Sequence, residues 1–469
     1  MKRAIILSAA LILIVLIGLV AVIAVINYTS KPFYVGVTFG GDTAAEAKQL
    51  IDRVKNYTNL FVIQSSPLQN NLTAMEEVCD YAVNAGLNII TYFSSFESQA
   101  AASFINTAQT RWGSHFLGLY YSDEPGGRML DFGMPLYDAS AGKQITKQTG
   151  YYTVNKDTFT FLTFFDSGII MKNSGNSTLQ YTATYYPNGT ISYYLSRGNF
   201  RLLFYQPDGT VEDINGKLVT DAGSISQFEP YSDLWESRPI KNYLDAAYFY
   251  VATQQNTLGS LSNQSSAKLF TSDYALYWWD YQGGYDTVFA ELGWNNTAAQ
   301  EIGLVRGAAN LQGKSWGTII TWTYTQAPYL TSGDEMYEQM KTSYECGAQY
   351  VLIFNYAENM TGPYGTLQDE HFQALERFWN EVVQNPNVVH GGIKAEAALV
   401  LPKDFGWGMR NQYDTIWGLW NADSTSQQIW TQLQSKLAQY GSKLDIVYDD
   451  PAHPVAGKYN KIYFWNQTS

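Results

Sequence analysis

Two glutamates stand where a carboxyl group could act as an acid or a base. Glu124 is the middle residue of an Asp-Glu-Pro sequence one residue after the apolar run 116–121, and Glu291 ends the run 287–291. A pair of carboxyl groups can cleave a glycosidic bond when they lie ~5–5.5 Å apart (retaining enzymes) or ~6.5–9.5 Å apart (inverting enzymes). We predict Glu124 as general acid/base. Glu291 is predicted as the nucleophile or, in an inverting enzyme, as the base that activates water.

Polar and aromatic side chains follow the same predicted strand ends. Rings of Trp and Tyr can stack on the apolar face of a sugar while their polar atoms bond its hydroxyl groups. The alternative for each aromatic residue is core packing, and for each acid it is a salt bridge or a helix cap. The predicted substrate-binding residues are Asp280, Asp123, Tyr121, Trp278, Trp279, Trp294, Trp322, Tyr324, Asn355 and Gln64.

Several other chemistries find no support. The four histidines are scattered without the spacing of metal ligands, so we predict no catalytic metal and no other cofactor. There is no Gly-x-Ser-x-Gly sequence to present a serine nucleophile. The formal net charge of −13 disfavours a nucleic acid as partner, because phosphate binding needs a basic surface.

These residues are to be positioned by alternating strands and helices. Residues 31–390 show eight strand-then-helix units, with strands predicted at 33–39, 60–64, 87–93, 116–121, 273–280, 287–291, 318–322 and 350–355. Eight such units fit an α/β fold of the closed (β/α)8 TIM-barrel type, whose chemistry lies at the C-terminal ends of the strands. The fifth helix is predicted to be short or missing, since strand six follows strand five almost directly.

Two segments interrupt or extend the barrel. Residues 128–239 alternate like antiparallel strands and contain Asn-Gly and Asp-Gly turns, which predicts a β-rich insertion after strand four. Residues 391–469 contain a strand at 397–401, an amphipathic helix at 426–440 and strands at 444–448 and 461–465. This is a small α/β domain without a Gly-rich phosphate loop, and we expect it to pack against the barrel.

The N-terminus predicts a membrane anchor. Residues 4–26 carry no charge and are long enough to cross a bilayer, which needs ~20 apolar residues. A cleaved signal peptide is the alternative, although its apolar region is usually ~7–15 residues. Lys2 and Arg3 favour a cytoplasmic N-terminus with the rest of the chain outside the cell membrane. Glycosylation sequons agree with export: Asn27, Asn56, Asn71, Asn176, Asn188, Asn263, Asn295, Asn359 and Asn466.

Three residues in predicted helices are interpreted as structural and buried. Cys79 and Cys346 fall in helices two and seven, far apart around a barrel, so we predict two buried free thiols. Arg306 stands inside an otherwise apolar helix, where a structural ion pair is the favoured role.

The Asp-Glu-Pro sequence at strand four resembles the Asn-Glu-Pro of clan A glycoside hydrolases, which implies a TIM barrel with Glu124 as acid/base. In that clan the nucleophile is a Glu ending strand seven, whereas this strand ends in Thr321-Trp322-Thr323-Tyr324. Other barrel glycosidases pair acids on strands four and six, as Glu124 and Glu291 would.

Segments 277–281, 291–294 and 317–322 also resemble membrane-anchored barrel proteins of archaea. The C-terminal domain is similar, more loosely, to amidotransferase-like domains that follow some β-galactosidase barrels. Together these patterns predict a membrane-anchored, extracytoplasmic glycoside hydrolase-like protein with a glycan substrate. The alternative is a surface protein whose barrel binds glycan or serves a structural role without catalysis.

Overall fold

The structure is a computed structural model. It describes residues 32–467, except 95–97, 263–266, 295–296, 357–363 and most of 133–241, where mainly the strands of a sheet are described. The predicted anchor, residues 4–26, lies outside the described residues. In the part of the chain that is described, no helix combines the length and apolar character that a membrane span requires.

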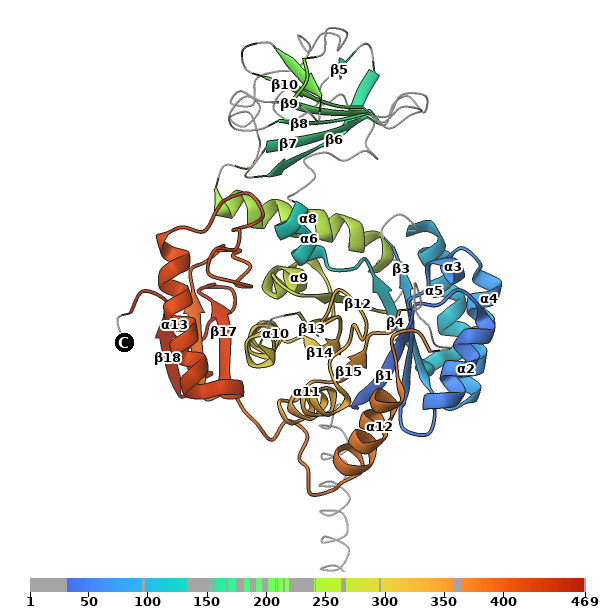
Figure 1. The fold of residues 1–469 in the computed structure, drawn as a ribbon. Helices are drawn as coiled ribbons and strands as arrows, with labels where there is room; N and C mark the ends of the chain where they lie inside the picture. The colour runs from blue at the N-terminus through green and yellow to red at the C-terminus, as the bar shows by residue number, and fades with distance from the viewer. Residues whose placement is uncertain are drawn as a thin grey trace, which may run out of the picture.

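Within the described residues, eight parallel strands close into a barrel, as the sequence predicted (Figure 1). Their order around the barrel is β1-β15-β14-β13-β12-β4-β3-β2. The strands are β1 (Tyr34–Phe39), β2 (Leu60–Ile63), β3 (Asn88–Phe93), β4 (Phe116–Tyr121), β12 (Lys268–Asp273), β13 (Thr287–Leu292), β14 (Ser315–Ile320) and β15 (Tyr350–Ile353).

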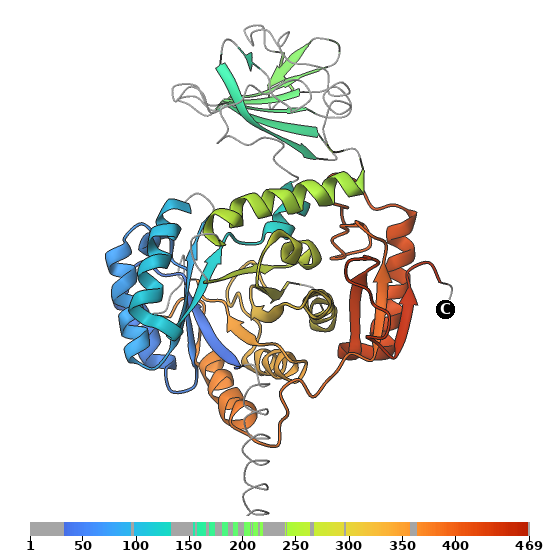
Figure 2. The ribbon, with the colours of Figure 1, turned by 180° about the vertical axis from the view of Figure 1, so that it is seen from behind.

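Helices surround this barrel on the outside (Figures 1 and 2). They are α2 (Ala44–Val54), α3 (Ser66–Gln69), α4 (Leu72–Asn84), α5 (Ser98–Trp112), α6 (Pro125–Phe132), α8 (Tyr243–Ser262), α9 (Tyr277–Gly283), α10 (Ala298–Gln312), α11 (Gly333–Glu345) and α12 (Asp369–Phe378). Local signals explain their starts: the Thr43 side chain accepts from the Glu46 N–H while the Glu46 carboxylate accepts from the Thr43 N–H. The Ser332 side chain caps α11 by accepting from the Glu335 N–H.

The barrel interior is a packed apolar core rather than a pore. Nine buried side chains fill it, and they include Tyr120, Phe270, Phe289 and Tyr350. A larger apolar layer lies between the strands and the surrounding helices. Because neighbouring residues of a strand face opposite sides, each strand contributes alternately to these two layers. Ligand space is therefore left only above the core, where the strands end.

The prediction for strand five was wrong. The strand is Lys268–Asp273, and the second half of the predicted stretch 273–280 belongs to helix α9. Tyr and Trp favour strands, and the segment is buried on all sides, so it shows no polar face that would reveal a helical period. The expectation of a short fifth helix is confirmed by α9 itself.

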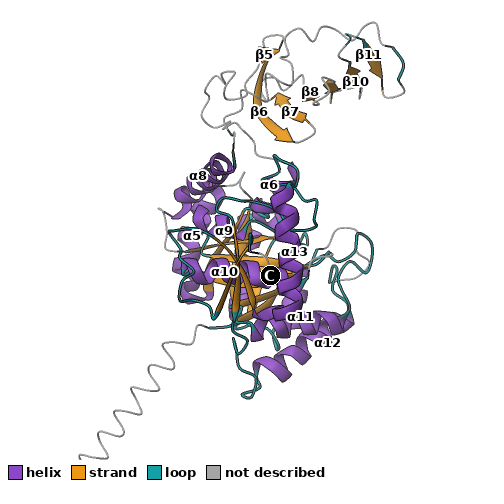
Figure 3. Cartoon of the chain, turned by 90° about the vertical axis from the view of Figure 1, so that its left-hand side faces the viewer, coloured by secondary structure: helices purple, strands orange, loops and turns teal. Residues whose placement is uncertain are grey.

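Two further sheets lie outside the barrel. A 7-stranded antiparallel sheet, β11-β10-β9-β8-β7-β6-β5, spans Thr153 to Asp213 and stands apart from the barrel, beyond α6 and α8 (Figures 1 and 3). Its strands are β5 (Thr153–Val154), β6 (Asp157–Phe165), β7 (Gly168–Asn173), β8 (Tyr181–Tyr185), β9 (Ile191–Leu195), β10 (Arg201–Tyr205) and β11 (Val211–Asp213). The C-terminal unit is a parallel sheet, β17-β16-β18, with one helix: β16 (Ala397–Leu401), α13 (Ser424–Tyr440), β17 (Leu444–Tyr448) and β18 (Lys461–Phe464).

The C-terminal unit docks on barrel helix α10. Arg306 of α10 forms a buried ion pair with Asp445 of β17, with 2.7 Å between Nε and Oδ1. The guanidinium also donates to the carbonyl oxygens of Ser442 and Leu444. The predicted structural role of Arg306 is thus confirmed, as are two buried free thiols at Cys79 and Cys346.

Candidate active site

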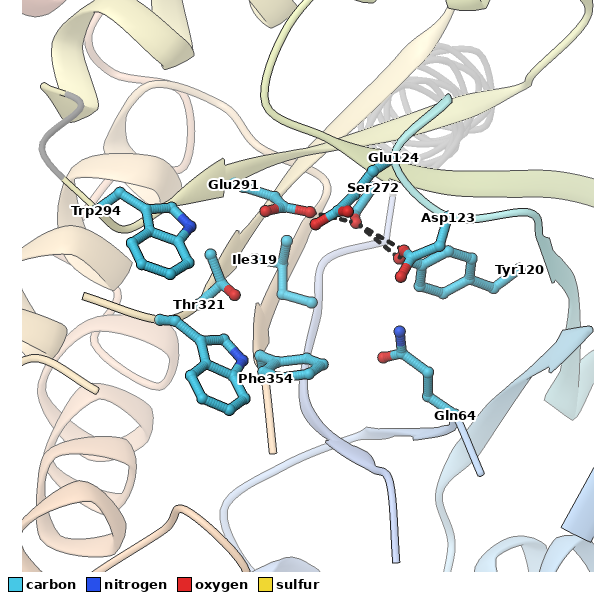
Figure 4. A pocket seen from close by; sticks show the side chains of 11 residues that line it. Gln64, Tyr120, Asp123, Glu124, Ser272, Glu291, Trp294, Ile319, Thr321 and Phe354 are labelled. Atoms are coloured by element: carbon cyan, nitrogen blue, oxygen red, sulfur yellow. Dashed lines mark hydrogen bonds between the residues drawn. The ribbon is translucent and has the colours of Figure 1, made fainter. Parts of the chain in front are cut away.

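A cavity of about 240 Å³ lies at the C-terminal ends of the barrel strands (Figure 4). Its polar side comes from three neighbouring strands, β4, β12 and β13. Its apolar side comes largely from β14, β15 and the residues that follow them. The volume is below the roughly 300–1,000 Å³ of pockets for drug-sized ligands, so it suits one small unit of a ligand. The lining residues are Gln64, Tyr120, Asp123, Glu124, Ser272, Glu291, Trp294, Ile319, Thr321, Trp322 and Phe354.

The two predicted catalytic glutamates meet in this cavity. Their carboxyl groups are hydrogen-bonded to one another, so they are closer than the separation expected for either hydrolytic mechanism. Burial raises the pKa of Glu124 to about 7; the charge of Asp123 adds to this, and the contact with Glu291 opposes it. Burial, followed by the charges of Glu124 and Asp123, raises the pKa of Glu291 well above its ordinary value. Two carboxyl groups in contact cannot both be ionised, so the pair holds a proton near neutral pH.

A hydroxyl network holds Asp123 and Glu291 in place. The Ser272 hydroxyl lies 2.7 Å from Glu291 Oε1 and 3.2 Å from Asp123 Oδ1. The Tyr120 hydroxyl donates to Asp123 and lies 2.7 Å from Ser272 Oγ. Burial raises the pKa of Asp123, and the hydrogen bonds from Tyr120 and Ser272 oppose that rise. The network connects the strand-four acid to the strand-six acid through the end of β12.

The backbone around Glu124 is bent into an unusual conformation. Ser122 and Glu124 have φ angles of 60° and 51°, and Trp294 across the cavity has 51°. Such left-handed conformations are unfavourable for residues with a Cβ and tend to cluster at functional sites. Hydrogen bonds hold them: Glu124 N–H donates to Ser272 O at 3.0 Å, and Trp294 N–H donates to Trp322 O at 2.7 Å.

Asp273 caps the helix that begins after Glu124. Its carboxylate accepts from the N–H groups of Gly126 and Gly127 in the first turn of α6. Glu124 precedes this helix, in the position where a capping side chain would normally turn back to bond the same N–H groups. Because Asp273 from the neighbouring strand does this, the Glu124 side chain is free to face the cavity.

Strand alternation selects Tyr120 rather than the predicted Tyr121 for the cavity. Tyr120 belongs to the barrel interior, whereas Tyr121 is buried in the layer between strands and helices. The prediction for Tyr121 is therefore corrected. Neighbouring residues of a strand face opposite sides, so Tyr120 and Tyr121 could not both face the cavity. Ser272 was missed because the predicted strand five began one residue after it.

Trp278, Trp279 and Asp280 lie away from the cavity, contrary to the prediction. Trp279 packs 4.6 Å from Trp417 and 4.5 Å from Tyr448 between ring centroids, and Trp278 packs on Tyr448 and His453. Asp280 accepts a hydrogen bond from Tyr250, and burial raises its pKa to about 8. These residues sit on α9, at the contact between the barrel and the C-terminal unit.

The remaining predicted binding residues divide into two groups. Gln64, Asp123, Trp294 and Trp322 line the cavity. Tyr324 is 49% exposed and is not a lining residue. The buried Asn355 side chain accepts from the N–H and hydroxyl of Thr366, so it anchors the loop after β15 instead of facing a ligand. Tyr324 and Asn355 are thus corrected as well.

Within the described residues, no group of three or more His, Cys, Asp or Glu side chains is arranged to hold a metal ion. The acids of the cavity bond to each other and to hydroxyl groups.

Comparison with known proteins adds little to this geometry. No protein-family model matches the chain, and no curated protein matches it. Among solved structures, pyruvate kinase from Pyrobaculum aerophilum matches with a TM-score of 0.29 and 13% sequence identity, over 80% of this chain and 82% of that chain.

Proposed function

We propose that this protein is a glycoside hydrolase that acts through Glu124 and Glu291. The observation that carries the proposal is the meeting of two glutamates from β4 and β13 in one partly aromatic cavity, with a proton held between them. An acid that keeps its proton near neutral pH is what protonation of a glycosidic oxygen requires. The resemblance of the Asp-Glu-Pro sequence to clan A enzymes supports Glu124 as that acid.

The reaction assigns one role to each glutamate. The reaction requires the shared proton to be on Glu124 and Glu291 to be ionised: Glu124 then gives its proton to the leaving oxygen while the Glu291 carboxylate attacks the anomeric carbon. Water then releases the sugar, giving its proton back to Glu124. A sugar must part the two carboxyl groups to ~5–5.5 Å for this chemistry. Ser272 holds Glu291, so Glu124 is the side chain that moves.

Substitution of each glutamate tests the proposal. Hydrolysis of a panel of 4-nitrophenyl glycosides, with different sugars and both anomers, would be measured for the full chain, Glu124→Gln and Glu291→Gln. We expect each substitution to lower kcat by about 10²–10⁴-fold without lowering the melting temperature. The matched control is Glu77→Gln, an exposed residue on α4 that should keep full activity. Equal activity in all four proteins would refute the assignment.

The direct contact between the carboxyl groups favours a second candidate, glycan binding without cleavage. In that case the unaltered protein would bind oligosaccharides, cleave no glycoside of the panel, and lose affinity in the two cavity variants.

We further propose that residues 4–26 anchor the chain in the cell membrane, with the barrel outside. The uncharged run and the basic Lys2 and Arg3 support this. Retention of the chain in membranes washed with alkaline carbonate, together with digestion of the barrel by protease added to intact cells, would test both the anchor and its orientation.

A further inference from the structure

The cavity carries negative charge without a balancing cation. Three of its eleven lining residues are acids, and none is Lys, Arg or His. Arg128, whose charge lowers the pKa of Asp123 and Glu124, is an exposed residue of α6 and does not line the cavity. A ligand carrying its own negative charge would meet carboxylates at close range in a partly dehydrated space, where like charges repel strongly.

The hydrogen-bonding groups of the cavity also favour a ligand that donates. The hydroxyl groups of Tyr120 and Ser272 are already engaged with Asp123 and Glu291. The side-chain oxygen of Gln64 is buried and has no hydrogen-bond partner among the described residues. In Figure 4 the Gln64 amide points toward the space between Asp123 and Phe354. A buried acceptor without a donor is unfavourable, so a turn of the amide that brings this oxygen to the cavity surface would let a hydroxyl or ammonium group of a ligand bond it.

We propose that the cavity binds an uncharged or cationic sugar unit, such as a hexose or an amino sugar, and rejects uronic acids and sulfated sugars. This rests on the proposed function in placing a sugar here, and adds the charge class of that sugar. The aromatic side can stack on neutral, amino and acidic sugar rings alike. The discrimination between them therefore lies in the carboxylates and Gln64. Rejection works through an unpaired charge and not through size.

Binding of matched methyl glycosides tests the proposal without any need for turnover. The probes are the methyl glycosides of galactose, galactosamine and galacturonic acid, and the same trio in the gluco series. Binding to the detergent-solubilised full chain would be followed by saturation-transfer NMR and calorimetry. We expect the uronide of each series to bind on the order of 100-fold more weakly than its neutral counterpart, with the amino sugar at least as tight as the neutral one.

Two substitutions at one position separate charge from shape. Gln64→Lys adds the missing cation and should raise uronide affinity by about tenfold while lowering amino-sugar affinity. Gln64→Met removes the amide without adding charge; it should weaken all six probes and keep their order. Melting temperatures of both variants show whether the barrel is intact.

Three results would overturn the inference: uronides binding as well as neutral sugars, a Gln64→Lys variant with the order unchanged, or no binding of any probe at millimolar concentration. Selective binding without cleavage would refute the proposed hydrolase activity and support the charge class of the sugar. Cleavage with a preference for uronides would support the hydrolase activity and refute the charge class.

Discussion

At the scale of single residues, the site depends on one proton held between two buried acids. Glu124 and Glu291 touch, and the pKa of each is raised above its ordinary value by burial. The same burial that makes Glu124 a proton donor near neutral pH makes its ionised form unfavourable in the folded protein. Acid chemistry and stability are therefore linked at this residue.

The link gives a prediction for the pH dependence of stability. The pKa of Glu124 rises from 4.5 to about 7, so between these values the folded state binds more protons than the unfolded state. Its contribution to stability is full below about pH 4.5 and is lost as pH rises through about 7. Other buried acids titrate in the same direction, so the comparison with Glu124→Gln isolates this one.

We expect the melting temperature of the unaltered protein to fall relative to that of Glu124→Gln as pH rises from about 4.5 to 7.5. Thermal denaturation followed by circular dichroism across this range measures the difference. Parallel curves for the two proteins would show that Glu124 titrates near its ordinary value.

The role of a single residue could be predicted where the residue stands out from its sequence surroundings. Glu124 and Glu291 each break or end an apolar run, and the structure places both in the cavity. Ser272 carries no such mark, because a serine at a strand end is common and its role arises from Glu291, a residue of the next strand. Asp280 resembled a strand-end acid only because its helix was buried on every side.

At the scale of elements, the short helix α6 keeps the Glu124 loop in position. Its first turn is held by Asp273 of the neighbouring strand. The approach is close because Gly126 has no side chain. A Cβ there would lie 2.6 Å from Ala275 O and 2.9 Å from Asp273 Oδ2.

Two glycine substitutions test this role of α6. Gly126→Ala should destabilise the protein by about 1–3 kcal/mol through overpacking, and should lower activity by displacing Glu124. Gly259→Ala is the matched control, since an added Cβ on α8 meets nothing within 4 Å. It should be neutral or stabilising by up to about 1 kcal/mol. Urea denaturation gives both values, and equal stabilities for the two variants would argue against a clamped α6.

Element prediction succeeded where two signals agreed. The strands at 397–401 and 444–448 were bounded by turns as well as apolar, and they coincide with β16 and β17. For α9 the apolar aromatic run was the only signal, and it fits a buried strand and a buried helix equally. Contacts with neighbouring elements decide between helix and strand here, because α9 packs between the barrel and the C-terminal unit. Those elements lie far away in the sequence, so the segment alone does not reveal them.

At the scale of the whole molecule, the C-terminal unit is joined to the barrel through α10. Gly303 and Gly307 allow the helix to lie directly on β17, where an added Cβ would come within 2.7 Å of Leu444 O or Val447 Cγ1. The buried Arg306–Asp445 pair crosses this contact, with Tyr459 donating to Asp445 Oδ2 at 3.0 Å. The expected packing of this unit against the barrel is confirmed by these contacts.

A double-mutant cycle measures how much the pair holds the two parts together. Arg306→Met leaves Asp445 buried and unpaired, which should cost about 3–5 kcal/mol in urea denaturation. Adding Asp445→Leu should recover a large part of that loss. Lys443→Met, which breaks the half-exposed pair with Glu396, is the control and should cost about 1 kcal/mol or less. Additive losses for Arg306 and Asp445 would mean that the pair is not coupled.

Under the proposed function, the division of the cavity into a carboxylate side and an aromatic side would make it a stereochemical filter. Pyranoses of one composition differ in which face of the ring carries a given hydroxyl group. A ring lying between Glu124 and the indole of Trp322 has one favourable way to present its two faces, because a hydroxyl turned toward the indole loses water and gains no acceptor. Epimers would therefore be unequal ligands before any bond is broken. The arrangement of strands around the barrel would thus distinguish epimers by the direction in which their hydroxyl groups point.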